Sequence, residues 1–211
     1  MTPSERLRIL FSELVSFRQE FLQLDKEAEN LNEIAMNAAV TAAQTGKSIR
    51  VYTEISNQIA QSAKKMTVMI EKNRQEANHI LNEILKATST NNLNKHFIHS
   101  QKNITNEHNK RYLAKKVALN DKEWKQYIKK INRHIYPEKT YLKSILQIQY
   151  KLFGIHNCLI IESSNLDNIQ SNSIENLSKN LSQSYETSIA CIQNLTRILK
   201  VITKLISNLS H

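Results

Sequence analysis

Apolar and small side chains recur along the first third of the chain at steps that alternate between three and four residues. Their positions are Leu7, Leu10, Leu14, Phe17, Phe21, Leu24, Ala28, Leu31, Ala35, Ala38 and Ala42. This alternation is the repeat of a left-handed coiled coil, in which one seam of each helix is buried along its whole length. The pattern therefore predicts a long helix, and Ser4, which follows Pro3, is suitably placed to cap its start.

The same rhythm returns after Gly46. Its positions are Tyr52, Ile55, Ile59, Ser62, Met66 and Met69, and it weakens through Ala77, Ile80 and Ile84. Glycine can take the positive φ that reverses a chain, and alanines in the seam let two helix backbones approach closely. We therefore predict an antiparallel coiled-coil hairpin over residues 1–88, with its turn near 46–49 and arms of similar length.

A second region is predicted over residues 95–211, as a basic helical region that ends in an amphipathic helix. The polar stretch "TSTNNLN" at 88–94 favours a break before it. Tyr136-Pro137 favours an interruption within it, because proline lacks an amide donor and disfavours helical geometry in the preceding residue.

Helices are expected on both sides of Pro137, over 95–133 and 138–162, and residues 163–173 are consistent with a loop or a weak helix. The expected inward positions of the first of these helices are Phe97, Ile104, Tyr112, Leu113, Val117, Trp124, Tyr127, Ile128 and Ile131. The three-and-four repeat is clear again at Ile192, Leu195, Leu199, Ile202, Ile206 and Leu209. This last helix would pack on the fourth helix, on the hairpin or on a second copy of the chain.

Composition supports an all-α fold of long helices forming a bundle. The 211 residues include only 2 glycines and 2 prolines, which helices exclude from their interiors and strand-rich folds need for their turns. No apolar stretch has the length of about 18 residues that a membrane span requires, and the start lacks a signal peptide, so we expect a soluble cytoplasmic protein. Cys158 and Cys191 lack metal-ligand spacing and are predicted to be buried, reduced thiols.

The net charge of +10 comes from the middle of the chain. Residues 95–151 hold 14 Lys and Arg against 4 Asp and Glu, whereas 1–94 hold 11 of each and 152–211 hold 4 of each. This basic segment fits an anionic partner, such as nucleic acid, an acidic lipid surface or an acidic protein, but the pattern favours the alternative of a solvated lysine-rich helix face. Its Trp124, Tyr127 and Tyr136 are placed either to stack on bases or, for the first two, to join the core.

The approach to Gly46 resembles the cytoplasmic signalling hairpin of the methyl-accepting chemotaxis receptors, over residues of about 5–88 and most strongly over 32–60. The matching positions of the family's tip are Asn37, Ala38, Ala39, Val40, Ala42, Ala43 and Gly46. In the same register, Arg50 falls on the family's arginine and Tyr52 on its phenylalanine. The resemblance implies a signalling role in which the tip contacts a histidine kinase or its coupling adaptor.

The chain also departs from that pattern. Thr41, Gln44 and Lys47 replace family Glu, Arg and Glu, and Ile49 and Val51 replace two glycines. Glu29 and Glu33 place charge where the receptors bury apolar side chains, which opposes the receptors' usual packing of dimers. Sensor and membrane segments of a complete receptor are not recognised.

No catalytic, cofactor or metal motif is found. His96 and His99 are spaced to share a helix face, with Glu107 and His108 further along, but they match no metal-binding motif. His156 lies two residues before Cys158, a spacing that points two side chains in different directions on a helix. No glycine-rich loop for phosphate is present, so we expect a non-enzymatic protein without cofactors.

Two functional hypotheses follow, with a third left open. The first is a signalling or adaptor protein, bacterial and chemotaxis-like, that binds a protein partner through Met36, Asn37, Arg50 and Tyr52 and forms a homodimer in one version. The second is a basic helical module that binds nucleic acid or acidic lipid through residues 95–151. The third is a coiled-coil bacterial effector.

Overall fold

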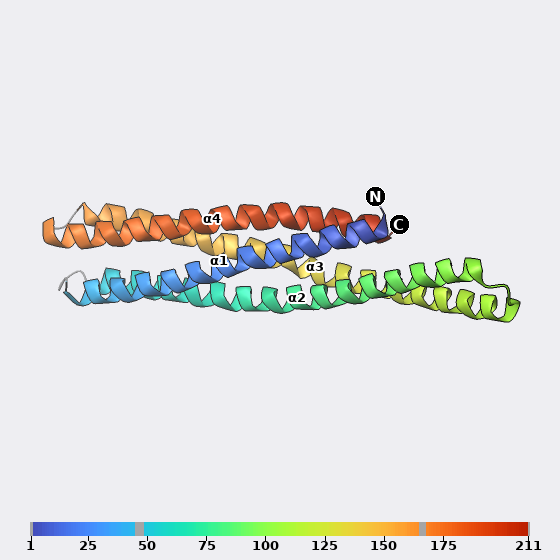
Figure 1. Cartoon of the computed structure of the whole chain (residues 1–211). Helices are drawn as coiled ribbons and strands as arrows, with labels where there is room; N and C mark the ends of the chain where they lie inside the picture. The colour runs from blue at the N-terminus through green and yellow to red at the C-terminus, as the bar shows by residue number, and fades with distance from the viewer. Residues whose placement is uncertain (1, 45–48, 165–167, 211) are drawn as a thin grey trace. The chain divides into compact units, whose positions relative to one another are not determined.

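The computed structural model describes a protein built from long helices (Figure 1). It describes residues 2–44, 49–164 and 168–210, with side chains over 2–43, 51–164 and 171–209. The helices are α1 (Pro3–Gln44), α2 (Ile49–Asn103), α3 (Glu107–Ser163) and α4 (Asn168–Ser210). The all-α prediction is confirmed.

The chain divides into two compact units, and each unit takes one segment from every helix. Unit 1 comprises residues 1–18, 74–139 and 197–211, and unit 2 comprises 19–73 and 140–196. This division differs from the one expected from the sequence, which separated 1–88 from 95–211. Each long helix contributes one part of its length to each unit, so a boundary along the chain does not separate them.

Unit 2 is a four-helix bundle in which every helix contacts two neighbours. The Oγ atom of Ser56 on α2 donates to the Ala35 carbonyl of α1 at 2.7 Å. The other three neighbouring pairs are joined by Gln149 with Met66, His156 with Ser178, and Ser184 with Glu27. Adjacent helices run antiparallel, as expected when successive helices are joined by short connections.

Unit 1 uses the same order of helices. Antiparallel α2 and α3 are joined by Glu76 with His134 at 2.6 Å and by Glu83 with Lys130 at 3.7 Å. The start of α1 contacts both of its neighbours in the bundle. Asn91 of α2 donates to Ser4 at 2.7 Å, and Arg6 donates to the Asn208 carbonyl of α4.

The buried seam predicted for α1 is confirmed at every position. The residues that are at most 3% exposed are Leu7, Leu10, Leu14, Phe17, Phe21, Leu24, Ala28, Leu31, Ala35, Ala38 and Ala42. The seam of α4 is confirmed at Ile192, Leu195, Leu199, Ile202, Ile206 and Leu209, all buried. The antiparallel packing of α1 on α2 agrees with the predicted hairpin, whereas Gly46 and its turn lie outside the described residues.

Thr2, rather than Ser4, caps α1. The Thr2 Oγ1 atom accepts from the Glu5 backbone amide at 3.3 Å, and the Glu5 carboxylate accepts from the Thr2 amide at 2.7 Å. This reciprocal pair is a capping box, with Pro3 at the first helical position. Hydrogen bonding of the Glu5 carboxylate to Thr2, first to its backbone amide and then to its side chain, lowers the pKa of Glu5.

The break predicted at 88–94 is wrong, because α2 continues to Asn103. The polar side chains of that stretch bind neighbouring helices, Asn91 to Ser4 and Asn94 to Asp121 at 2.6 Å. The connection to α3 lies ten or so residues later, where the side chain of Asn106 accepts from the amides of the first helical turn.

The interruption predicted at Pro137 is also wrong, because α3 runs through it. Proline has a φ close to that of a helix, so its cost is a lost hydrogen bond and crowding of the preceding turn. Ile135 is 4% exposed and Glu138 is 0% exposed, so α3 is packed into the core just before and just after Pro137, while the adjacent Tyr136 is 78% exposed. We attribute the continuity of α3 to that packing.

Over the described residues, none of the helices has a segment apolar and long enough to cross a membrane.

A polar groove between α1 and α4

The contact between α1 and α4 in unit 2 is rich in polar side chains. Asn194 of α4 donates to the Glu20 carboxylate at 3.3 Å. Ser184 donates to Glu27 at 2.9 Å. Ser188, between these positions on α4, is fully buried. Coiled-coil seams are usually apolar, so the polar contacts of this stretch depart from that pattern.

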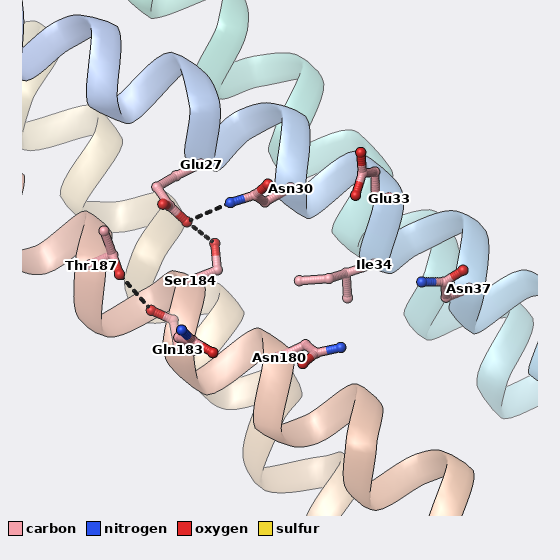
Figure 2. Close-up of a pocket in the computed structure, with 9 residues that line it drawn as sticks. All are labelled: Glu27, Asn30, Glu33, Ile34, Asn37, Asn180, Gln183, Ser184 and Thr187. Carbon is pink, nitrogen blue, oxygen red and sulfur yellow. Dashed lines mark hydrogen bonds between the residues drawn. The ribbon is translucent and has the colours of Figure 1, made fainter.

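The helices enclose a groove here with a volume of about 260 Å³ (Figure 2). Its lining residues are Glu27, Asn30, Glu33, Ile34, Asn37, Asn180, Gln183, Ser184 and Thr187. Figure 2 shows the α1 residues on one side and the α4 residues on the other. The groove therefore lies within unit 2 and draws on two helices that are far apart in sequence.

Three buried side chains form its floor. Glu27, Ser184 and Ile34 are 5%, 5% and 6% exposed, while Asn30 and Asn37 on the rim are exposed. The Glu27 carboxylate accepts hydrogen bonds from Ser184 at 2.9 Å, Asn30 at 3.3 Å and, outside the lining, Gln23 at 3.4 Å. All three donors are neutral, so they solvate the carboxylate without compensating its charge.

The groove has a negative electrostatic character in a protein of net positive charge. Its lining includes two carboxylates, Glu27 and Glu33, and none of the lining residues is Lys, Arg or His. Cys191 lies in the adjoining seam of α4 and is buried. Burial, followed by the charge of Glu20 and its hydrogen bond and by the charge of Glu27, raises the pKa of Cys191 to about 11.

The partner-binding residues expected from the sequence fall in different environments. Asn37 is exposed and lines the groove, and its neighbour Met36 is 56% exposed. Tyr52 is 0% exposed, so in this conformation it contributes to the core and presents no surface to a partner. The side chain of Arg50 lies outside those that the structure describes.

Burial also sets the chemistry of Tyr52. Its hydroxyl has no hydrogen-bond partner among the described residues. Burial and then the negative charge of Glu162 raise the pKa of this tyrosine. Both properties follow from the burial of the side chain, which is 0% exposed.

The α1–α4 groove was missed by sequence reasoning, although one signal for it is present. On α4 the steps of three and four from Leu181 to Leu195 pass through Ser184, Ser188 and Cys191 in place of large apolar residues. Those small polar residues mark a seam that cannot be filled by apolar side chains alone. Nothing in the sequence shows that Glu27, which flanks the seam of α1, would face them.

The basic residues of α2 and α3 lie mostly on the surface of unit 1. Over 95–122 the cations are Lys95, Lys102, Lys110, Arg111, Lys115, Lys116 and Lys122. Inward-facing Phe97 and Leu113 are only partly buried there, whereas Ile128 is 3% exposed further along α3. Tyr112, expected in the core, is 56% exposed.

The aromatics of this segment are divided between core and surface. Trp124 and Tyr127 are partly buried, and Tyr136 is 78% exposed. Lysine ammonium groups lie over two of the rings, Lys116 at 5.6 Å from Tyr112 and Lys130 at 5.8 Å from Tyr127. The rings thus have cationic partners within the protein itself.

The histidines and cysteines considered as candidate sites are not grouped for chemistry over the residues that the structure describes. His96, His99 and His108 are exposed. Within the described ranges, no three His, Cys, Asp or Glu side chains are grouped so that they could hold a metal ion. Cys191 is buried as predicted, but Cys158 is exposed, because it lies on the outer face of α3.

Comparison with known proteins adds no assignment. The chain matches no protein-family model, and no curated protein is significantly similar to it.

Proposed function

We propose that the protein is a non-enzymatic adaptor that binds a protein partner through the outer face of α1 near the α1–α2 connection. The observation that carries the proposal is a pair of exposed apolar side chains. Met36 and Val40 are each 56% exposed and lie one turn apart, on the side of α1 opposite the buried Ala35 and Ala38. Such a pair favours protein contact, and methionine adapts well to varied partners.

The resemblance to the chemoreceptor hairpin suggests the class of partner. It implies a histidine kinase or a coupling adaptor, contacted by the tip that includes Met36 and Asn37. Glu29 and Glu33 are exposed on the same helix. Their charge opposes self-association through that part of α1, so we favour a different protein over a second copy of this chain.

The test is a double substitution, Met36→Ser with Val40→Ser, assayed for binding to a purified chemoreceptor kinase with its coupling adaptor. We expect the double variant to bind about tenfold or more weakly than the native chain, because burying two such side chains contributes a few kcal/mol. Val68→Ser is the matched control, since Val68 is 48% exposed on α2 of the same unit. Helicity is followed by circular dichroism.

Two outcomes would reject the proposal in this form. One is equal binding by the double variant and the Val68→Ser control. The other is that the native chain does not bind the kinase and its coupling adaptor, and light scattering shows that it stays a monomer. Tyr52→Ala is unsuitable as a test, because removing a fully buried ring would destabilise the fold regardless of any partner.

The basic part of α2 and α3 favours a second candidate function, attachment to an anionic surface. Its support is the exposure of most cations in 95–122. Affinity for single-stranded DNA or for vesicles containing phosphatidylserine should fall steeply as salt rises, and further in a Lys115→Gln, Lys116→Gln variant. Lys64→Gln with Lys65→Gln is the control pair. This candidate would be excluded if the affinity did not depend on salt. It would also be excluded if the Lys64/Lys65 and Lys115/Lys116 variants lost the same amount of affinity.

A further inference from the structure

Glu27 is a buried carboxylate whose hydrogen-bond partners are all neutral. It is 5% exposed and accepts from Ser184, Asn30 and Gln23. A charge taken out of water is costly unless it is paired as well as hydrogen-bonded. Glu27 lines the groove, and Figure 2 shows its side chain between α1 and α4, beside Asn30 and Ser184.

The rim of the groove also favours a cation over an anion. Glu33 adds a second carboxylate. The other rim groups are the side-chain amides of Asn30, Asn37, Asn180 and Gln183 and the hydroxyl of Thr187. An amide or hydroxyl can turn its oxygen toward a donor, so a group that carries several N–H bonds would find many acceptors here. An anion would meet two carboxylates and no cationic side chain from the lining.

Size and shape narrow the class of ligand. The volume of about 260 Å³ exceeds the roughly 30 Å³ occupied by one water molecule, and it is below the range of about 300–1,000 Å³ typical of drug-sized ligands. Buried Ile34 provides an apolar wall beside the carboxylates. A flexible alkyl chain with a cationic end matches that combination, because its methylene groups pack on an apolar surface while its head is solvated.

We propose that the groove between α1 and α4 binds an organic cation, a guanidinium or primary ammonium group, at Glu27 and Glu33. The head group donates to Glu27 and to nearby rim oxygens, and the alkyl chain lies along Ile34. Glu33 is six residues further along α1, so it receives the second cationic end of a ligand that carries one. The cation comes from a small amine or from an Arg or Lys side chain of a partner protein. This inference does not depend on the proposed adaptor function.

Titration calorimetry with agmatine and spermidine tests the site on the full chain. We expect Glu27→Gln and Glu33→Gln each to weaken binding by about tenfold, because each removes a charge-assisted hydrogen bond while keeping the shape of the side chain. Glu29→Gln is the matched control, since Glu29 is exposed on α1 and does not line the groove. It should bind like the native protein.

The source of the cation is distinguished with a peptide. An arginine peptide that binds more tightly than agmatine, and loses binding when arginine is replaced by citrulline, indicates a protein side chain. Tighter binding of the free amine indicates a small-molecule ligand. Citrulline keeps the shape of arginine without its charge, so the comparison isolates the cation.

Three results would overturn the inference. The first is no heat of binding with any of the amines or with the arginine peptide. The second is equal loss of affinity in Glu29→Gln and in Glu27→Gln, which would indicate binding to the general surface. The third is equal binding of the citrulline peptide. If Glu27→Gln proves unfolded by circular dichroism, Glu33→Gln alone decides, because its side chain is on the exposed rim.

Discussion

Tyr52 is a large side chain at the start of α2 that is completely buried, with its hydroxyl unpaired among the described residues. The ring contributes apolar area to unit 2, whereas the buried hydroxyl has a desolvation cost that no described hydrogen bond offsets. The two parts of the side chain therefore have opposite effects on stability. They can be separated by substitution.

We expect Tyr52→Phe to leave the free energy of unfolding unchanged or to raise it by about 1 kcal/mol, because only the unpaired hydroxyl is lost. Tyr52→Ala should lower it by about 3–5 kcal/mol, because a large cavity forms in the core. Urea denaturation followed by circular dichroism measures both. A marked loss of stability in Tyr52→Phe would mean that the hydroxyl is hydrogen-bonded in solution.

The seam of α1 changes from large to small side chains as it approaches the α1–α2 connection. Phe17 and Leu24 are followed by Ala35, Ala38 and Ala42, all at most 2% exposed. Small side chains let neighbouring backbones approach, and the hydrogen bond from Ser56 to the Ala35 carbonyl at 2.7 Å shows that α2 lies close to α1 there. The alanine run is thus a packing requirement of this pair of helices.

Ala38→Leu should reduce the free energy of unfolding by about 1–3 kcal/mol, because the added volume has no space in the buried seam. Ala39→Leu is the control, since Ala39 is exposed on the next position of the same helix and should have little effect. Chemical denaturation compares the two variants. Equal stabilities would show that α1 and α2 are not closely packed at this level.

The whole molecule is organised so that each unit depends on segments distant in sequence. Unit 1 combines 1–18 with 74–139 and 197–211, and unit 2 combines 19–73 with 140–196. A cut in the connection between α2 and α3 therefore leaves neither fragment with a complete unit. Separating 1–88 from 95–211, the domains expected from sequence, has the same consequence.

Fragments 1–105 and 106–211 should each be much less helical alone than within the intact chain, since an exposed seam cannot stabilise a long helix by itself. Mixing them should restore helicity, because the missing halves of both units are then supplied. Far-UV circular dichroism measures the effect before and after mixing. If either fragment alone unfolds cooperatively at the temperature of the intact chain, the helices do not depend on each other in this way.

The sequence by itself determined the fold class and the buried faces of the long helices. The three-and-four spacing from Leu7 to Ala42 and from Ile192 to Leu209 is a property of neighbouring residues, and burying one helix face requires nothing more specific. Other local signals, the polar turn-forming side chains of Asn91 and Asn94 and the proline at 137, were misleading. Their local tendency to end a helix was outweighed by contacts with other helices.

Tertiary structure alone decided which faces meet, and with them the composition of the groove. Glu27 and Ser184 are far apart along the chain, and each taken singly looks like an ordinary polar helix residue. Their juxtaposition depends on the register of α4 against α1, which is set by the packing of all four helices in unit 2. Two roles are expected for Tyr52 from the sequence, a position in the seam after Gly46 and a partner contact at the tip. The packing of unit 2 decides for the seam, because Tyr52 is 0% exposed.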